Sequence, residues 1–408
     1  MVQFLFFLIL FILIADFILE RSLSFLNAKA AAQPIPSLLS DVYTHSQYRK
    51  QQLYFQANTK FGMITSAVSL TVVLLMFCTG GFGWLSQLVG GWSENPIVIS
   101  LIFFGLIFLA NELISIPFEW YQTFVIEERF GFNKMTPKLF ITDKLKGYLL
   151  SVVVGGAILT LVMWIYRLNP TYFWLIAWSC ITVISLFISF FYSELIVPLF
   201  NKQTPLEAGE LRDEIEKFAV KSNFKLKNIF VIDGSKRSTK ANAYFTGFGK
   251  KKRIVLYDTL IRDLTTDEIV AVLAHEVGHN KHNHTLKNIL LNMPYTLLMF
   301  FLFGFMLRSQ TLAQALGGSE ASFHLNALGF GFIYSPLAMV IGLGMNILSR
   351  RFEYQADAFV KVNGLSNQLI SSLKKISSKA LSNLTPHPAY VFVHYSHPTL
   401  YQRIKALL

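Results

Sequence analysis

The chain has 408 residues, of which 53% are hydrophobic and only 15% are charged, and its mean hydropathy is +0.46. This composition is too apolar for an ordinary soluble enzyme and predicts an integral membrane protein. The net charge of +12 is typical of membrane proteins with basic cytoplasmic loops, and because the sequence has no zinc-finger spacing and no RNP-like motif, we expect no nucleic-acid partner.

Apolar runs long enough to cross a bilayer, which takes about 20 residues, recur along the chain. They lie at about 3–19, 62–84, 96–118, 147–167, 171–194, 287–307 and 328–348. The first run lacks a basic segment before it and a small-residue cleavage site after it, so we interpret it as a retained helix and not as a signal peptide. The predicted fold class is therefore an α-helical integral membrane protein with seven transmembrane helices.

Lysine and arginine are distributed unequally between the two sides of these spans. The basic residues gather in segments 20–61, 119–146, 195–286 and 349–408. On the other side, segment 85–95 has no basic residue and segment 308–327 has only Arg308. Because cytoplasmic loops carry an excess of Lys and Arg, we expect the N-terminus outside and the C-terminus in the cytoplasm.

Two polar parts on the basic side are expected to form one small α+β cytoplasmic domain. Residues 204–224 have an amphipathic helical pattern, residues 226–234 have the pattern of a strand, and residues 242–260 that of a hairpin around Gly249. The other polar part is the C-terminal segment. The chain is thus divided into 1–194 (helices one to five with their loops), 195–286 (a cytoplasmic segment with the HEVGH motif), 287–348 (helices six and seven) and 349–408 (a C-terminal cytoplasmic segment).

The pentapeptide HEVGH begins at His275. Positions i and i+4 of a helix share one face, so the imidazoles of His275 and His279 can bind one zinc ion. Glu276 follows the first ligand and can act as general base on the attacking water. Thr265 and Glu268 fit a capping box and indicate where this helix begins. A bare HExxH also arises by chance as a polar part of a helix, but its place on a well-signalled helix favours a metal site.

A catalytic zinc needs a third protein ligand and one open position. Glu353 and Asp357 are i and i+4 on a second predicted helix, so one carboxylate can bind the metal while the other accepts a hydrogen bond from a ligand histidine. The alternative is a solvated acidic face. His282 and His284 are rival ligands, but their spacing puts them off the face of His279 unless the helix ends there. We therefore expect both on the solvent side or at an interface.

This polar cluster borders two of the predicted spans. HEVGH lies just before the sixth apolar run, and Glu353 lies five residues after the seventh. At about 1.5 Å per residue, both lie within roughly 8–15 Å of the hydrocarbon edge if the helices continue. A zinc ion on the cytoplasmic ends of two membrane helices suits a substrate that is itself bound to the membrane.

Six stretches of the chain occur in an order that resembles a known family. They are FVIEERFGFNKMTPKLFITDKLKG (124–147), ELIVPLFNKQTPLEAGELRDEIE (194–216), GSKRSTKANAYFTGFGKKKRIVLYDTL (234–260), HEVGH, EYQADAF and HYSHPTLYQRI. The set resembles the type I CAAX prenyl proteases, which form the Ste24 group of zinc metallopeptidases. Only the N-terminal quarter is similar more loosely.

The resemblance implies an architecture and an activity. The architecture is seven transmembrane helices around a large water-filled chamber, with a zincin-like catalytic domain at its cytoplasmic rim. The activity is endopeptidase cleavage of C-terminal CAAX sequences whose cysteine carries an isoprenoid. The expected partners are accordingly a lipidated or membrane-bound peptide or protein substrate and membrane lipid.

The resemblance also assigns the metal site. It assigns one zinc ion per chain to His275, His279 and Glu353, and catalysis to Glu276. Asp357 matches the carboxylate that stands behind a ligand histidine.

Three further residues are assigned only through the resemblance. Asn242, in NAYFTG, matches the residue that holds the substrate backbone beside the metal. His397, in SHP, matches a catalytic histidine that faces the active site and can stabilise the oxyanion. Arg403 matches a nearby arginine, which we assign to substrate binding.

Two other functions fit parts of the sequence. An HtpX-like quality-control protease would share HEVGH and the downstream glutamate, but it is expected to have fewer spans and to lack the EERFGFNK stretch. A seven-helix transporter would explain Asp16 and Glu112 within apolar runs, although a water-filled chamber explains them equally. The compact loops favour a bacterial form in the inner membrane; a eukaryotic form is expected in the endoplasmic reticulum.

Overall fold

The structure is a computed structural model that describes residues 1–224, 228–246 and 253–408. Within these residues, seven helical segments are long and apolar enough to cross a membrane, which confirms the predicted number of spans. They are α1 (Val2–Ala31), α2 (His45–Cys78), α4 (Pro96–Tyr121) with a π-helical extension (Gln122–Glu127), α5 (Pro137–Leu150) continued by α6 (Gly156–Leu168), α7 (Phe173–Phe191) continued by α8 (Val197–Phe200), α12 (His284–Met306) and α14 (Phe323–Val362).

Short polar signals set where several of these helices begin. Thr44 and Gln47 form a capping box before α2, and the Asn95 side chain accepts a hydrogen bond from the backbone N–H of Ile97 at the start of α4. α4 and α5 both begin with proline. Proline is favoured there because a first-turn N–H has no partner inside the helix. Local chemistry therefore fixes the helix ends, while the apolar runs fix the helix lengths.

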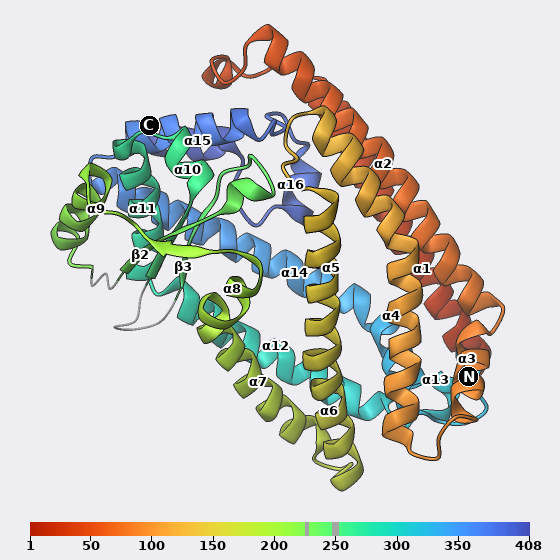
Figure 1. Cartoon of the computed structure of the whole chain (residues 1–408). Coiled ribbons are helices and arrows are strands. Elements are labelled where there is room, and N and C mark those ends of the chain that lie inside the picture. The colour runs from red at the N-terminus through yellow and green to blue at the C-terminus, as the bar shows by residue number, and fades with distance from the viewer. Residues whose placement is uncertain (225–227, 247–252) are drawn as a thin grey trace.

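Two short helices, α3 (Gly81–Gly90) and α13 (Gln310–Ala315), pack at the end of the membrane helices that lies far from the sheet (Figure 1). Phe77, Phe103 and Leu312 are fully buried there and join α2, α4 and α13 in one apolar cluster. A cavity of about 1390 Å³ with mostly apolar walls lies between α2, α3, α4 and α14.

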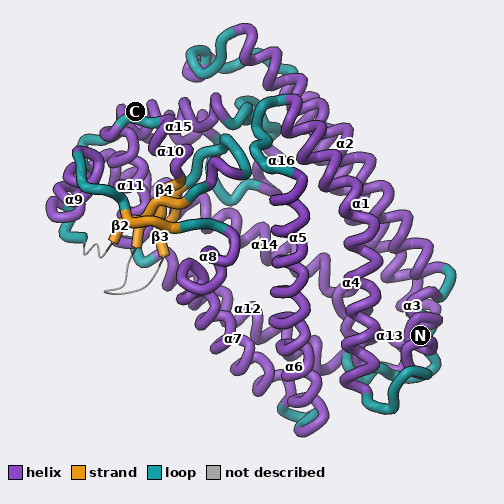
Figure 2. The backbone as a smooth tube through the Cα atoms, viewed as in Figure 1, coloured by secondary structure: helices purple, strands orange, loops and turns teal. Residues whose placement is uncertain are grey.

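The sheet has four strands in the described residues, and their spatial order is β1-β2-β4-β3. Figure 2 shows the strands in orange, gathered on one side of the molecule. They are β1 (Gln203–Pro205), β2 (Asn228–Ile232), β3 (Ala243–Thr246) and β4 (Arg253–Tyr257). β2 and β4 are parallel, whereas β1 and β3 are antiparallel to their neighbours. The predicted strand at 226–234 and the pairing predicted across 242–260 are confirmed, while the turn around Gly249 lies outside the described residues. β3 is an edge strand.

Helices α9 (Glu210–Lys221), α10 (Asp258–Asp263), α11 (Thr266–Lys281) and α15 (Ser366–Lys379) gather around the sheet at one side of the molecule (Figure 1). Their apolar faces share one core, which includes Ile215, Leu256, Ile269 and Leu369. The amphipathic helix predicted at 204–224 is confirmed in a shorter form as α9. It begins only after Gly209, because the residues of β1 pair with β2 instead.

The longest helix, α14, links the membrane part to the sheet part. It has 40 residues and continues without a break from the seventh apolar run through Glu353 and Asp357. α12, the sixth span, begins only three residues after α11 ends. Both helices that carry the predicted metal ligands are therefore directly connected to membrane spans. Two short helices, α16 (Pro388–His394) and α17 (Leu400–Leu407), complete the C-terminal segment.

Candidate metal centre

α11 carries HEVGH, and its start is set by local chemistry. The Thr265 hydroxyl accepts a hydrogen bond from the backbone N–H of Glu268 at 3.4 Å, and the Glu268 carboxylate accepts one from the backbone N–H of Thr265 at 2.9 Å. The predicted capping box is confirmed. Glu268 also forms an ion pair of 2.7 Å with Lys375 of α15, which ties the start of α11 to the C-terminal segment.

α11 and α14 cross closely at Gly278. A Cβ atom on Gly278 would lie 3.0 Å from the Cα atom of Ala356 and 3.1 Å from its carbonyl oxygen. These distances are tighter than ordinary packing allows, so a residue without a side chain is favoured here. Because Gly278 lies within HEVGH, the close crossing brings His275 and His279 to the face of α14 that carries Glu353.

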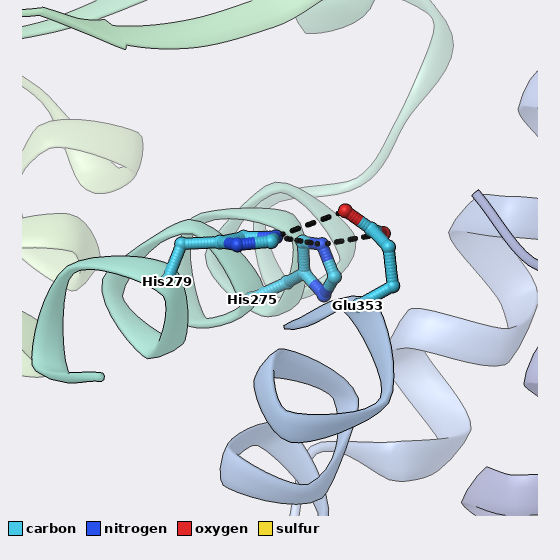
Figure 3. A group of neighbouring side chains, drawn as sticks. All are labelled: His275, His279 and Glu353. Atoms are coloured by element: carbon cyan, nitrogen blue, oxygen red, sulfur yellow. Dashed lines mark hydrogen bonds and ion pairs between the residues drawn. The ribbon is translucent and has the colours of Figure 1, made fainter. Parts of the chain in front are cut away.

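The side chains of the three predicted ligands converge between these helices (Figure 3). His279 Nε2 lies 3.1 Å from His275 Nε2 and 3.1 Å from Glu353 Oε1. His275 Nε2 lies 3.4 Å from Glu353 Oε2. Ligand atoms arranged tetrahedrally at about 2.0–2.1 Å from zinc lie about 3.3 Å from one another. The spacing therefore fits a single zinc ion.

The surroundings of this cluster favour positive charge at its centre. Glu353 is 4% exposed, and its Oε2 atom makes no hydrogen bond among the described residues, although His275 Nε2 lies 3.4 Å and Arg403 Nη1 3.6 Å away. A buried carboxylate oxygen without a partner is costly, and contact with a cation removes that cost. Burial disfavours the charged form of His275, but hydrogen bonds to Asp357 and Glu353 outweigh burial and raise the pKa of His275 above its usual range. The residues present therefore fit the metal.

His275 is held from behind by Asp357, which is 1% exposed. Asp357 Oδ1 lies 2.8 Å from His275 Nδ1. Arg403 of α17 donates to both oxygens of Asp357, with Nε–Oδ2 at 2.9 Å and Nη2–Oδ1 at 2.6 Å. This pairing avoids an isolated buried charge. Arg403 also lines the cavity beside the metal ligands, and its assignment to substrate binding stays a prediction.

His282 and His284 were expected on the solvent side or at an interface; His282 is exposed, whereas the solvent side is wrong for His284, which is buried between helices. His284 is 2% exposed, and its Nδ1 lies 3.0 Å from Nδ1 of His279. The physical reason is that α11 ends at Lys281 and that Asn283 adopts a left-handed backbone conformation with φ of +54°. This turn directs the first residue of α12 back toward α11.

A cavity of about 680 Å³ brings Glu276, Asn242 and His397 to the same place as the three ligands. Asn242 directly precedes the edge strand β3, and its backbone carbonyl accepts a hydrogen bond from Tyr257 at 3.1 Å. His397 Nε2 lies 3.3 Å from Glu353 Oε1, and its side chain is 62% exposed. Four separate parts of the chain, around residues 242, 275–279, 353 and 397, thus supply groups to one cavity.

Sequence reasoning missed the residues that fix the start of this edge strand. Lys240 Nζ lies 3.0 Å from Glu127 Oε2 and 3.1 Å from the Tyr54 hydroxyl. Burial disfavours the ammonium, but the bonds to Tyr54 and Glu127 raise the pKa of Lys240 above its usual range. The membrane helices thereby hold the chain two residues before Asn242. Glu127 and Lys240 are 113 residues apart, so no local pattern could have linked them.

Part of the cavity wall is apolar and was also missed. It consists of side chains from α10, α11 and α15, namely Leu260, Val272, Leu369, Leu373 and Ile376. These residues lie on helices that meet only in the folded chain, so the sequence alone does not reveal their common face. A wall of this kind suits an aliphatic side chain next to the metal.

Comparisons with known proteins agree with this geometry. Residues 24–202 match the family model described as "CAAX prenyl protease N-terminal, five membrane helices", and residues 205–408 match that of peptidase family M48. The chain is 37% identical to the "CAAX prenyl protease 1 homolog" of Oryza sativa subsp. japonica, over 98% of this chain and 96% of the relative. The chain belongs to the Ste24 group of peptidase family M48.

Other members of the Ste24 group are similar over comparable lengths. "CAAX prenyl protease 1" of Saccharomyces cerevisiae is 35% identical over 97% of this chain and 93% of that protein. The crystal structure of S. mikatae Ste24p is 34% identical, has a TM-score of 0.93 and is matched over 99% of both chains. The resemblance inferred from the six sequence stretches is thereby confirmed.

Membership of the Ste24 group favours a CAAX-type membrane protease over the two alternatives, an HtpX-like protease and a seven-helix transporter. The protein is a membrane zinc metalloprotease with seven spans in its described residues and a peptidase domain that contains a small sheet. An HtpX-like protease was expected to have fewer spans, and the N-terminal family match favours the Ste24 group over it. The peptidase match likewise favours an enzyme over a transporter.

We expect Gly278→Ala to push α11 away from α14, because the added methyl group would meet backbone atoms that cannot rotate aside. Overpacking of this kind typically costs about 1–3 kcal/mol. The unfolding temperature should fall and zinc should be held less tightly, as thermal unfolding and metal analysis would measure. Gly331→Ala adds the same group to α14 where nothing lies within 4 Å, and because alanine favours a helix more than glycine does, it should lower neither quantity. Identical behaviour of the two variants would contradict the close crossing.

Proposed function

We propose that this protein cleaves C-terminal CAAX-type sequences of prenylated or otherwise membrane-bound substrates. Each chain holds one zinc ion through His275, His279 and Glu353. The observation that carries the proposal is the shared cavity, in which these side chains meet Glu276 and the start of an edge strand beside the membrane helices. Relatives named CAAX prenyl proteases cover nearly the whole chain, which supports the same substrate class.

Glu276 is the general base of the proposed reaction. A zinc ion in the site supplies Lewis acidity, which makes water a better nucleophile and polarises the scissile carbonyl. Glu276 takes a proton from the water while the oxygen of the water bonds to the carbonyl carbon. The same carboxyl group then gives the proton to the amide nitrogen as the carbon–nitrogen bond breaks. Glu276 follows His275 in the helix and lines the cavity, which supports this role.

The substrate is held as an extended strand along β3. An edge strand has unpaired backbone groups to which an extended peptide can add, and Asn242 at its start can bind the peptide through its side-chain amide. His397 donates from Nε2 to the oxygen that becomes negative during attack. Its Nδ1 lies 2.9 Å from the Ser396 hydroxyl. A proton on that hydroxyl pointing to Nδ1 leaves the ring proton on Nε2, as this role requires.

The first test is cleavage of a farnesylated CAAX peptide and of the same peptide without the lipid, with product masses measured by mass spectrometry. We expect cleavage after the modified cysteine, loss of activity with a zinc chelator and recovery with added zinc. The matched control is Glu276→Gln, which keeps the shape of the side chain and removes the base. It should keep its zinc and lose about a hundredfold or more in turnover. Near-normal turnover by this variant would remove Glu276 from catalysis.

The second test separates positioning from charge stabilisation. Asn242→Ala should weaken both substrate binding and turnover, because the peptide loses its anchor beside the metal. His397→Ala should lower mainly kcat, by about 100-fold or more, with KM and zinc content close to those of the wild type. Steady-state kinetics on folded, zinc-loaded protein would measure both. Unchanged kinetics in either variant would refute the role proposed for that residue.

The protein is further proposed to place its metal site in the cytoplasm. The distribution of Lys and Arg supports this orientation, and the site would face the cytoplasm from a bacterial inner membrane, which the compact loops favour, or from the endoplasmic reticulum. In a background with Cys78 and Cys180 replaced by alanine, Glu207→Cys and Glu320→Cys are two exposed probes. A membrane-impermeant maleimide should label only Glu320→Cys from outside intact cells or from the lumenal side. Labelling of both from one side would contradict the orientation.

A further inference from the structure

The junction between α11 and α12 buries a histidine beside a metal ligand. α11 ends at Lys281, and the left-handed turn at Asn283 makes His284 the first residue of α12. The His284 ring is 2% exposed and stacks on Phe352 of α14, with ring centroids 4.1 Å apart and planes 11° from parallel. The ring is thus fixed in position by three helices.

Both ring nitrogens of His284 have partners. Nδ1 lies 3.0 Å from Nδ1 of His279, and Nε2 lies 2.8 Å from Oε1 of Gln355. Gln355 lies on α14, between the ligand Glu353 and Asp357. Two hydrogen bonds in series, through His284 and Gln355, therefore connect Nδ1 of His279 to α14, the helix that carries Glu353.

The chemistry of these groups determines where the protons lie. An amide oxygen only accepts hydrogen bonds, so Nε2 of His284 carries a proton. A neutral imidazole has one N–H, which leaves Nδ1 of His284 as an acceptor, and Nδ1 of His279 must donate to it. His279 then has its free lone pair on Nε2, the atom that lies 3.1 Å from Glu353 Oε1. If Nδ1 of His284 donated to Nδ1 of His279 instead, the proton of neutral His279 would lie on Nε2, and this nitrogen could not bind a metal ion.

We propose that His284 and Gln355 are positioning residues, which hold His279 in the tautomer and orientation that bind the metal. The proposal rests on the ligand set given under the proposed function. It distinguishes the two ligand histidines, since His275 is held by the charged pair of Asp357 and Arg403, whereas His279 is held by a neutral imidazole and an amide. A second carboxylate behind His279 would add another buried negative charge close to Glu353, and the neutral pair avoids that cost.

The test compares two replacements of His284 in the purified full-length protein. His284→Phe keeps a ring for stacking on Phe352 and removes the acceptor. Zinc affinity, measured by competition with a chelator, should fall about tenfold or more. The absorption spectrum of the Co²⁺-substituted protein should change, because the ligand ring is no longer fixed. His284→Asn places an amide oxygen near the position of Nδ1, and it should recover most of the affinity and the wild-type spectrum.

Two further variants separate this inference from its premises. His282 is exposed, and its ring stacks on that of His284 with centroids 5.4 Å apart and planes 15° from parallel. His282→Phe keeps a ring for this stacking and removes no partner of His279, so it should leave affinity and spectrum unchanged. His279→Ala should lose most of the zinc, and retention of zinc there would refute the ligand set itself. If His279→Ala loses zinc while His284→Phe binds it with wild-type affinity and spectrum, the positioning role is overturned.

If His284→Phe does not fold, Gln355→Met tests the positioning role instead. Gln355 is exposed, so this variant should fold, and methionine keeps the length of the side chain without the accepting oxygen. We expect weaker zinc binding with an unchanged unfolding temperature of the metal-free protein. Wild-type zinc affinity in this variant would overturn the proposal.

Discussion

The close crossing of α11 and α14 is the constraint on which the rest of the site depends. A zinc site needs its ligand atoms about 3.3 Å apart, and here two of the three proposed ligands come from one helix and the third from another. Gly278 and Ala356 let the two backbones approach closely enough for this spacing. A larger side chain at either position would separate Glu353 from the histidines, whatever the quality of the ligands themselves.

Burying polar groups is costly unless they have partners of matching charge or hydrogen-bonding capacity, and most groups of this cluster have one. Arg403 balances Asp357, and the imidazole of His284 meets His279 without adding charge. Glu353 keeps one oxygen without a hydrogen bond among the described residues. Arg403 Nη1 lies 3.6 Å from this oxygen, which still accepts no hydrogen bond and so remains free to contact a cation between the three side chains.

Local patterns predicted the parts of the structure that local interactions determine. The seven apolar runs, the capping box at Thr265 and the i, i+4 spacing of HEVGH each depend on neighbours within a few turns, and all three were found from the sequence. The burial of His284 was not, because it depends on a helix ending at Lys281 and on the backbone conformation of the single residue Asn283. Periodicity continues a helix through such a break, and so it placed His284 on the wrong face.

The contact between Lys240 and the membrane helices could not be predicted because its partners lie far apart in the sequence. This contact connects the membrane helices to the sheet. Lys240 meets Tyr54 of α2 and Glu127 beyond α4, while the strand that follows it borders the metal cavity. The sheet edge and α14 are therefore both positioned by membrane helices, the first through an ion pair and the second through an unbroken backbone. β3 is also held by its pairing with β4, so a shift of α2 or α4 relative to α14 would strain the contact of Lys240 next to the edge strand. The membrane part of the chain thus helps to position two walls of the cavity that holds the proposed zinc ligands.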